Sequence, residues 1–217
     1  MLLKKKFNVT FLFDNSNLWL KKYIIDHKFN LNKKFIIKFS TNRNKVLNQD
    51  IVFPIGYTKI LPNSFLEKNK HIICVHASKL PKDKGGAPLQ HQILRNKNKI
   101  FISLFKAKSK VDSGPIFLQD YFNLNGTELY KEIRYKQARA VIKIMTKYLK
   151  KFPAISPIKQ NGKSTYNKKR TPKDSELDIN KTIKDQFNHL RINDNIKFPS
   201  FFIYRKTKYF IKIYKEK

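Results

Sequence analysis

The sequence is poor in cysteine, in acidic residues and in long apolar runs, and each shortage excludes a class of protein. Only one of its 217 residues, Cys74, is a cysteine, which excludes an internal disulfide and a zinc site built from several cysteines. Lysines interrupt every apolar run before it reaches the roughly 20 residues that a membrane-spanning helix needs. The apolar start at residues 1–3 is too short for a signal-peptide core. We therefore expect a cytoplasmic protein without a membrane span.

The shortage of acidic residues leaves a large positive charge. The chain has 47 lysines and arginines against 15 aspartates and glutamates, a formal net charge of +32 at pH 7, which is typical of proteins that bind nucleic acid. Only seven of the basic residues are arginines, however, and the lysines are spread along the whole chain. Because Lys, Asn, Ile, Phe and Tyr share A/T-rich codons, the base composition of the genome explains the charge equally well. The charge predicts attraction of small anionic ligands, and nucleic acid is a less favoured partner.

Apolar runs and helical patterns alternate along the first 150 residues, which is typical of an α/β protein. Strands are expected at 7–13, 35–39, 51–55, 72–76, 100–105 and 116–121, and helices at 18–27, 89–94 and 128–150, the last with Thr127 as a cap. We predict an α/β fold with a twisted, mostly parallel sheet and helices on both faces.

The rest of the chain predicts a connector and a small C-terminal unit. Residues 153–173 are rich in Pro, Gly, Ser, Asn and Lys, which indicates an irregular connector. Asp178 is a suitable N-cap for a helix with apolar residues at helical spacing, namely Ile179, Ile183, Phe187 and Leu190. Residues 200–204 and 208–213 predict a β-hairpin. We therefore expect a main domain at 1–152, a connector at 153–173 and a helix-and-hairpin extension at 174–217.

His76 is the first candidate for a functional residue. It stands at the carboxyl end of the strand expected at 72–76, and ligands of open α/β sheets collect beyond such strand ends. Its imidazole can act as acid or base near neutral pH. Between Glu67 and Asp120 the only carboxylates that could partner it are Asp83 and Asp112. We expect the side chain of Asp83 to be solvated, because it lies in the Pro/Gly loop at 81–88.

The segments around His76 resemble the folate-dependent formyltransferases. The resemblance rests on Ile72-Ile73-Cys74-Val75-His76-Ala77-Ser78-Lys79-Leu80-Pro81, on Gly85-Gly86-Ala87-Pro88, on Val111-Asp112-Ser113-Gly114 and on residues 50–62 with their Gly-Tyr and Ile-Leu-Pro steps. Residues 170–178, 188–191 and 198–202 are similar to the segment that follows the catalytic domain in amino-sugar N-formyltransferases. The resemblance implies a Rossmann-like domain that passes a formyl group from N10-formyltetrahydrofolate to the amine of an amino sugar. Such an acceptor is often nucleotide-linked and destined for a surface polysaccharide such as lipopolysaccharide O-antigen.

The resemblance also implies roles for individual residues. His76 is the catalytic acid/base, and Asp112 is its electrostatic and proton-relay partner. The family usually places an asparagine that polarises the formyl oxygen where this chain has Cys74, and a thiol is a weak hydrogen-bond donor. Loss of one such donor lowers the rate by about 10²–10³, unless Asn15, Ser78 or a backbone N–H replaces it. The expected folate contacts are Tyr57, Ile60, Leu61, Pro62, Lys110 and Val111.

Other interpretations remain open. Methionyl-tRNA formylation fits the positive charge, although the chain looks short for the C-terminal tRNA-binding domain of those enzymes. A homologue that binds folate, an anionic sugar or nucleic acid without turnover fits Cys74. In a purely structural interpretation, His76 ends a strand, Asp112 forms a turn and Cys74 packs as a small apolar residue. We predict no metal site, because the five histidines are scattered, and a homodimer remains open.

Overall fold

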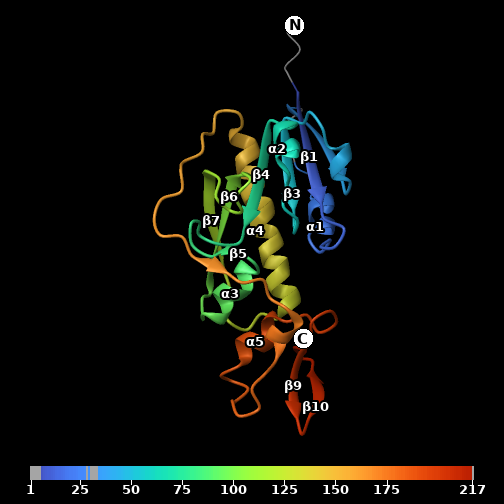
Figure 1. Ribbon diagram of the computed structural model, residues 1–217, viewed down its shortest axis with the longest axis vertical. Coiled ribbons are helices and arrows are strands. Elements are labelled where there is room, and N and C mark those ends of the chain that lie inside the picture. The colour runs from blue at the N-terminus through green and yellow to red at the C-terminus, as the bar shows by residue number, and fades with distance from the viewer. Residues whose placement is uncertain (1–5, 28, 30–33, 217) are drawn as a thin grey trace.

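A six-stranded sheet forms the main part of the molecule (Figure 1). The computed structural model describes residues 6–27, 29 and 34–216, so the apolar start at 1–3 lies outside the described residues. The sheet has the order β2-β1-β3-β4-β6-β7. Its strands are β1 (Phe7–Phe13), β2 (Phe35–Ser40), β3 (Ile51–Ile55), β4 (His71–His76), β6 (Lys99–Lys106) and β7 (Ile116–Asn123).

The sheet is parallel in its first four strands and antiparallel at one edge. Strands β2, β1, β3 and β4 pair in parallel, whereas β6 runs antiparallel to both β4 and β7. The loop at 107–115 between β6 and β7 is too short for the crossover that a parallel pair needs. The predicted α/β fold with a mostly parallel sheet is confirmed.

Helices cover both faces of this sheet. The long α4 (Tyr130–Lys151) and α1 (Lys21–Asp26) pack on one face in a core that includes Phe11, Phe53 and Met145. On the other face, α2 (Asn63–Glu67) packs on a smaller cluster that includes Leu12 and Ile72. The two clusters follow from the strand geometry, because successive side chains point to opposite faces. Helix α3 (Pro88–Leu94) joins the larger core next to β6.

The start of α4 differs from its prediction. Thr127 is not the cap, because its N–H and hydroxyl both bond to the side chain of Asn125. The helix begins at Tyr130, and the N–H of Leu129 donates to Glu132 Oε2 at 2.8 Å. Glu132 thus satisfies one of the unpaired donors of the first turn.

The C-terminal unit contains the predicted hairpin but not the predicted helix. Residues 178–186 form turns, and α5 spans only Phe187–Ile192. Ile179 and Ile183 are 53% and 65% exposed, so their helical spacing forms no buried face. Strands β9 (Ser200–Tyr204) and β10 (Thr207–Ile211) form the hairpin, which extends from the lower end of the molecule (Figure 1).

The predicted connector is an ordered strap along the side of the molecule. Residues 153–171, called the strap below, leave the end of α4, pass β7 and return to the loop after β4 (Figure 1). Ile158 bridges to Ile116 of β7, and β8 (Tyr166–Asn167) pairs with β5 (Lys84–Gly85). The strap therefore reaches the loop that follows His76. A short 3₁₀ helix, η3 (Pro172–Ser175), comes next, and another, η2 (Arg43–Lys45), precedes β3.

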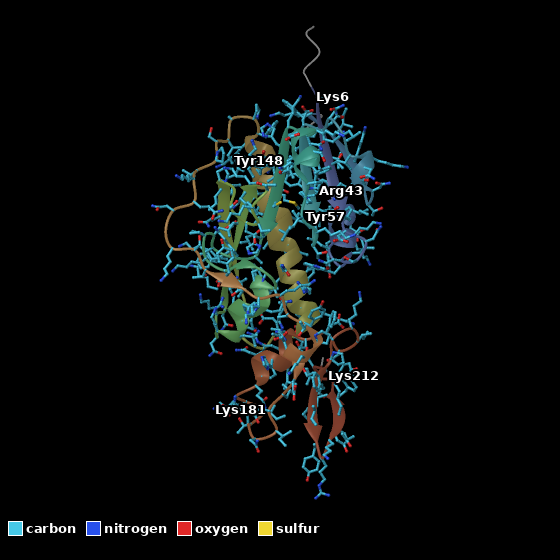
Figure 2. The ribbon with its side chains drawn as sticks, in the orientation of Figure 1. Lys6, Arg43, Tyr57, Tyr148, Lys181 and Lys212 are labelled. Atoms are coloured by element: carbon cyan, nitrogen blue, oxygen red, sulfur yellow. The ribbon has the colours of Figure 1, made fainter. Side chains whose placement is uncertain are left out.

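The positive charge is spread over the surface. Lys6 lies at one end of the molecule, Arg43 beside the sheet, and Lys181 and Lys212 at the opposite end (Figure 2). This spread agrees with the even distribution of lysines along the sequence. In the described ranges no helix has both the length and the apolar character needed to cross a membrane.

Candidate active site

A cleft of about 970 Å³ opens at the carboxyl ends of β1, β3 and β4. Its walls include the turn at 16–20 after β1, residues 54–58 at and beyond the end of β3, and the start of α4. His76, the last residue of β4, and Asp112, from the loop between β6 and β7, both line it. His76 thus lies at the carboxyl end of its strand, as the sequence predicted, and open α/β sheets commonly bind ligands beyond such ends.

His76 and Asp112 form the central pair of the cleft. His76 Nδ1 lies 3.6 Å from Asp112 Oδ2, and the two side chains are only 11% and 13% exposed. The same carboxylate oxygen accepts the N–H of Gly85 at 2.9 Å, which fixes its position. At 3.6 Å the pair is an electrostatic contact longer than a hydrogen bond. Among residues 6–27, 29 and 34–216, no three His, Cys, Asp or Glu side chains group as a metal site would require.

The other nitrogen of His76 bonds to a residue that the sequence did not assign to the site. Nε2 lies 2.8 Å from the backbone carbonyl oxygen of Asp83. Because a carbonyl only accepts hydrogen bonds, Nε2 carries the hydrogen and donates it. Nδ1, which faces Asp112, is then the nitrogen available for proton exchange.

Asp83 is held in place by its own contacts. Its carboxylate pairs with Arg95 Nη2 at 2.7 Å and is 14% exposed, so the expectation of a solvated side chain was wrong. Its N–H donates to Thr165 Oγ1 of the strap at 2.8 Å. Its φ of 58° is in the left-handed region, which a non-glycine residue adopts only with local support. Arg95 and Thr165 provide that support.

The strap holds both loops that carry the site. The Gln160 side-chain amide donates to the carbonyl oxygens of Asp112 and Gly114, at 2.9 and 2.7 Å. At the other loop, a Cβ on Gly86 would lie 2.5 Å from the Cα of Lys169. Gly86 is therefore required for the close approach of the strap, which explains the Gly-Gly step without a nucleotide cradle.

Asp14 organises the wall of the cleft after β1. Its buried carboxylate accepts the N–H and hydroxyl of Ser16 at one oxygen and those of Thr58 at the other. Burial alone would raise the pKa of Asp14, but the hydrogen bonds from Thr58 and Ser16 hold it well below its usual range. The turn after β1 is thereby joined to the loop after β3.

Cys74 lies two residues before His76 on β4, so their side chains share the face that carries Ile72 and α2. Burial raises the pKa of the Cys74 thiol to about 12, and the Asp112 carboxylate adds to the shift. The thiol therefore stays protonated, which argues against a nucleophilic thiolate. Neither expected replacement donor is in position. Asn15 is exposed outside the lining of the cleft, and the buried Ser78 donates to Lys82 O at 2.8 Å.

The residues expected to contact folate lie around the α2 side of the cleft. Tyr57 and Val111 line it, whereas Ile60, Leu61, Pro62 and Lys110 lie outside its lining. Tyr57 and Leu61 pack against the smaller core cluster below α2. Ile60 and Val111 are 70% and 48% exposed, which leaves apolar surface for a flat ring. Their role as folate contacts stays a prediction.

The α4 side of the cleft is formed by residues that the sequence did not indicate. Arg134 stacks on Trp19 and Tyr130, with its guanidinium carbon 4.7 and 5.1 Å from their ring centres. The only features of the sequence that could have indicated Arg134 and Trp19 are that the chain has a single tryptophan and few arginines. Arg170, which the sequence placed only in the C-terminal similarity, also lines the cleft, and it bonds to Asn193 at the end of α5, a helix that contacts α4.

Comparison with known proteins identifies a family. The sequence matches the family model described as formyl transferase over residues 21–149. The methionyl-tRNA formyltransferase of Rickettsia massiliae is 31% identical over 146 residues, which are 64% of this chain and 48% of that protein. The one of Caldicellulosiruptor saccharolyticus is 29% identical over 171 residues, which are 76% of this chain and 55% of that protein. The chain spans about half the length of the curated relatives it matches.

Solved structures share the fold. A methionyl-tRNA formyltransferase from Clostridium thermocellum has a TM-score of 0.82 at 22% identity, covering 97% of this chain and 94% of that one. A 4-N formyltransferase from Francisella tularensis has a TM-score of 0.75 at 18% identity, covering 97% and 98%. HypX from Aquifex aeolicus, in complex with tetrahydrofolic acid, has a TM-score of 0.73 at 12% identity, covering 96% and 38%.

Proposed function

Because the chain belongs to the formyl transferase family, we propose that it transfers a formyl group from N10-formyltetrahydrofolate to the primary amine of an amino sugar. One observation carries the proposal: His76 Nδ1 faces Asp112 at 3.6 Å, in a cleft at the carboxyl end of the sheet. The pair supplies the acid/base group that amine formylation needs.

The donor fits the α2 side of the cleft. N10-formyltetrahydrofolate supplies the formyl carbon as an electrophile. Tyr57 and Val111, which line the cleft, offer an aromatic and an exposed apolar surface to its ring system. Cys74 and His76 lie on the same face of β4. A donor bound there has its formyl group next to the pair.

His76 handles the proton. The amine must lose a proton as it attacks, and Nδ1 accepts it because Nε2–H is engaged by the Asp83 carbonyl. Asp112 then stabilises the positive charge on the ring by a Coulomb attraction across 3.6 Å. The imidazolium returns the proton to N10 of the donor as the bond between N10 and the formyl carbon breaks, and tetrahydrofolate leaves. A positioned acid/base group of this kind contributes about 10²–10⁴-fold to the rate. The protonated thiol of Cys74 is a weak partner for the developing oxyanion, so the rate is lower than with an amide donor.

The amino-sugar acceptor enters from the α4 side. Arg170, Thr171 and Ser175 line the cleft, and they belong to the segment that resembles amino-sugar N-formyltransferases. The acceptor is a nucleotide-linked amino sugar made in the cytoplasm for surface polysaccharide.

The test is release of tetrahydrofolate from N10-formyltetrahydrofolate with a panel of nucleotide-linked amino sugars. We expect turnover with at least one sugar, a loss of about 10²-fold or more in His76→Ala, and normal turnover in His27→Ala, an exposed histidine outside the cleft. Equal turnover in His76→Ala and the parent protein would refute the proposed role of this site.

Methionyl-tRNA formylation is the second candidate, because the curated relatives carry that name. Methionyl-tRNA is therefore an arm of the same assay. Turnover with the tRNA alone, falling steeply with salt, would select this function over the amino-sugar one. Ligand-induced stabilisation without turnover in any arm would indicate a non-catalytic binding protein.

A further inference from the structure

The lining of the cleft has an excess of positive charge. Among the residues that the structure describes, five cationic side chains and two carboxylates, Asp112 and Asp194, line the cleft; the cations are Lys131, Arg134, Lys169, Arg170 and Lys197. Asp194 already accepts the N–H groups of Ile196 and Lys197 through one oxygen. Across the described ranges of the chain, none of the five cations pairs with a carboxylate within 4.0 Å. Their charge is uncompensated by close partners.

Arg134 is held in one geometry without a counter-charge. Its guanidinium stacks on Trp19 and Tyr130, and its Nη1 donates to the neutral Gln137 Oε1 at 2.9 Å. Its Nε is buried and has no hydrogen-bond partner among the described residues. The planar group is therefore positioned before any ligand binds, which lowers the entropy lost on binding.

Arg170 is positioned in the same way from the end of the strap. Its Nη2 donates to the backbone carbonyl of Asp174 at 2.6 Å and to Asn193 Oδ1 at 3.2 Å. Its Nη1 is buried and finds no hydrogen-bond partner in the part of the chain that the structure describes. Burial lowers the pKa of Arg170, and Asp174 only partly opposes this. The carboxylate of Asp174 is bonded to Thr171 instead.

We propose that Arg134 and Arg170 form a phosphate-binding subsite that holds the diphosphate of the acceptor. This inference rests on the proposed function. It states which group of the acceptor, the diphosphate, the enzyme recognises. Guanidinium groups bind phosphate oxygens through paired hydrogen bonds. One carboxylate neutralises the charge of only one of the two arginines. A diphosphate has enough negative charge and enough acceptor oxygens for both guanidinium groups. Binding energy gained there orients the amine towards His76.

The test is titration calorimetry of the full chain with inorganic pyrophosphate and with uridine diphosphate. We expect Kd to rise by about tenfold or more in Arg134→Gln and in Arg170→Gln, and Arg170→Lys to retain part of the affinity. The matched control is Arg139→Gln, which removes the same charge from an exposed position on α4 outside the cleft. It should change Kd by less than about twofold. Circular dichroism and the melting midpoint verify that each variant is folded.

Unchanged affinity in both arginine variants would overturn the subsite. An equal loss of affinity in Arg139→Gln would also overturn the subsite, because the positive charge of the arginines would then attract the ligand at long range rather than by direct contact. Tighter binding of a short CCA-ended RNA than of uridine diphosphate would assign the cations to nucleic acid and also overturn it.

The binding assay contains no formyl donor, so its outcome is separate from that of the proposed function. Binding that depends on both arginines without any formyl transfer would leave the subsite standing and refute the function. Turnover with an acceptor KM that neither variant changes would refute the subsite alone.

Discussion

The Nε2–H of His76 donates to the backbone carbonyl oxygen of Asp83 at 2.8 Å. This bond determines which ring nitrogen faces Asp112 and is available for proton exchange. The carbonyl is positioned in turn by the ion pair of Asp83 with Arg95 and by the bond from its N–H to Thr165. The proton-exchanging geometry of the candidate site therefore depends on residues outside the cleft lining.

Arg95 should act as a positioning residue. In Arg95→Gln we expect kcat to fall by about tenfold, with KM for donor and acceptor within about twofold, because only the alignment of His76 changes. Arg95→Lys should recover part of the loss by restoring an ion pair with Asp83. Steady-state kinetics measures both. Lys97→Gln, an exposed neighbour, is the control. A loss confined to KM would show that Arg95 acts on binding instead.

Cys74 should limit the rate. An amide at this position, in Cys74→Asn, can donate to the developing oxyanion, and we expect kcat/KM to rise by about 10²-fold. Cys74→Ala should change it by no more than a few-fold, because the thiol is only a weak donor. Single-turnover kinetics on the three proteins measures the effect. A lower rate in Cys74→Asn would mean that the site uses the thiol or cannot accommodate the amide.

Asp14 should stabilise the protein in a pH-dependent way. The folded state holds the pKa of Asp14 below its ordinary value of about 3.9. Its contribution is therefore present above about pH 4 and is lost as the pH falls through the folded pKa. In Asp14→Asn the side-chain amide nitrogen replaces one of the two acceptor oxygens, so the N–H and hydroxyl of either Ser16 or Thr58 lose their acceptor. The free energy of unfolding should fall by about 1–3 kcal/mol at pH 7.

Urea unfolding of the parent and Asp14→Asn proteins at several pH values measures this. The difference in free energy of unfolding should shrink below about pH 4. A difference that stays constant with pH would show that the carboxylate charge is not the source of the stability.

Gly86 should be required for the strap to reach the loop after β4. A Cβ at this position would lie 2.5 Å from Lys169 Cα, so Gly86→Ala should cost about 1–3 kcal/mol and reduce turnover by displacing the strap. Gly162→Ala is the control, since a Cβ there meets no atom of the described residues within 4 Å, although its φ of +98° adds some strain. Equal effects of the two substitutions in urea unfolding would exclude the steric explanation.

The sequence predicted what depends on short-range patterns. Apolar runs located the six strands of the main sheet, and the end of one run located His76 at the edge where ligands bind. The helix expected from Asp178 was wrong for a related reason. The spacing of Ile179 and Ile183 is helical, but spacing does not show whether a partner surface exists. Both side chains are largely exposed, and Gln186 bonds to the backbone of Asp178 and Lys181 to hold turns instead.

Short-range sequence patterns could not predict the contacts between distant parts of the chain. The strap has no periodicity, so nothing in its sequence indicated that Gln160 and Thr165 hold the loops of Asp112 and Asp83. Asp83 contacts His76 through its backbone carbonyl oxygen. Every residue type has such an oxygen, so the sequence could not indicate this contact. The stacking of Arg134 on Trp19 joins positions 115 residues apart through the fold alone.

The proposed formyl transfer through His76 and Asp112 is tested by following the formyl group itself. The parent protein, His76→Ala and Asp112→Asn are incubated with donor labelled in the formyl carbon and with the best nucleotide-linked amino sugar. Mass spectrometry then determines whether label is bonded to the sugar nitrogen. We expect labelled N-formyl sugar from the parent protein and at least about 10²-fold less from either variant. Labelled product at the parental rate in both variants, or none from the parent protein with any sugar, would contradict the proposal.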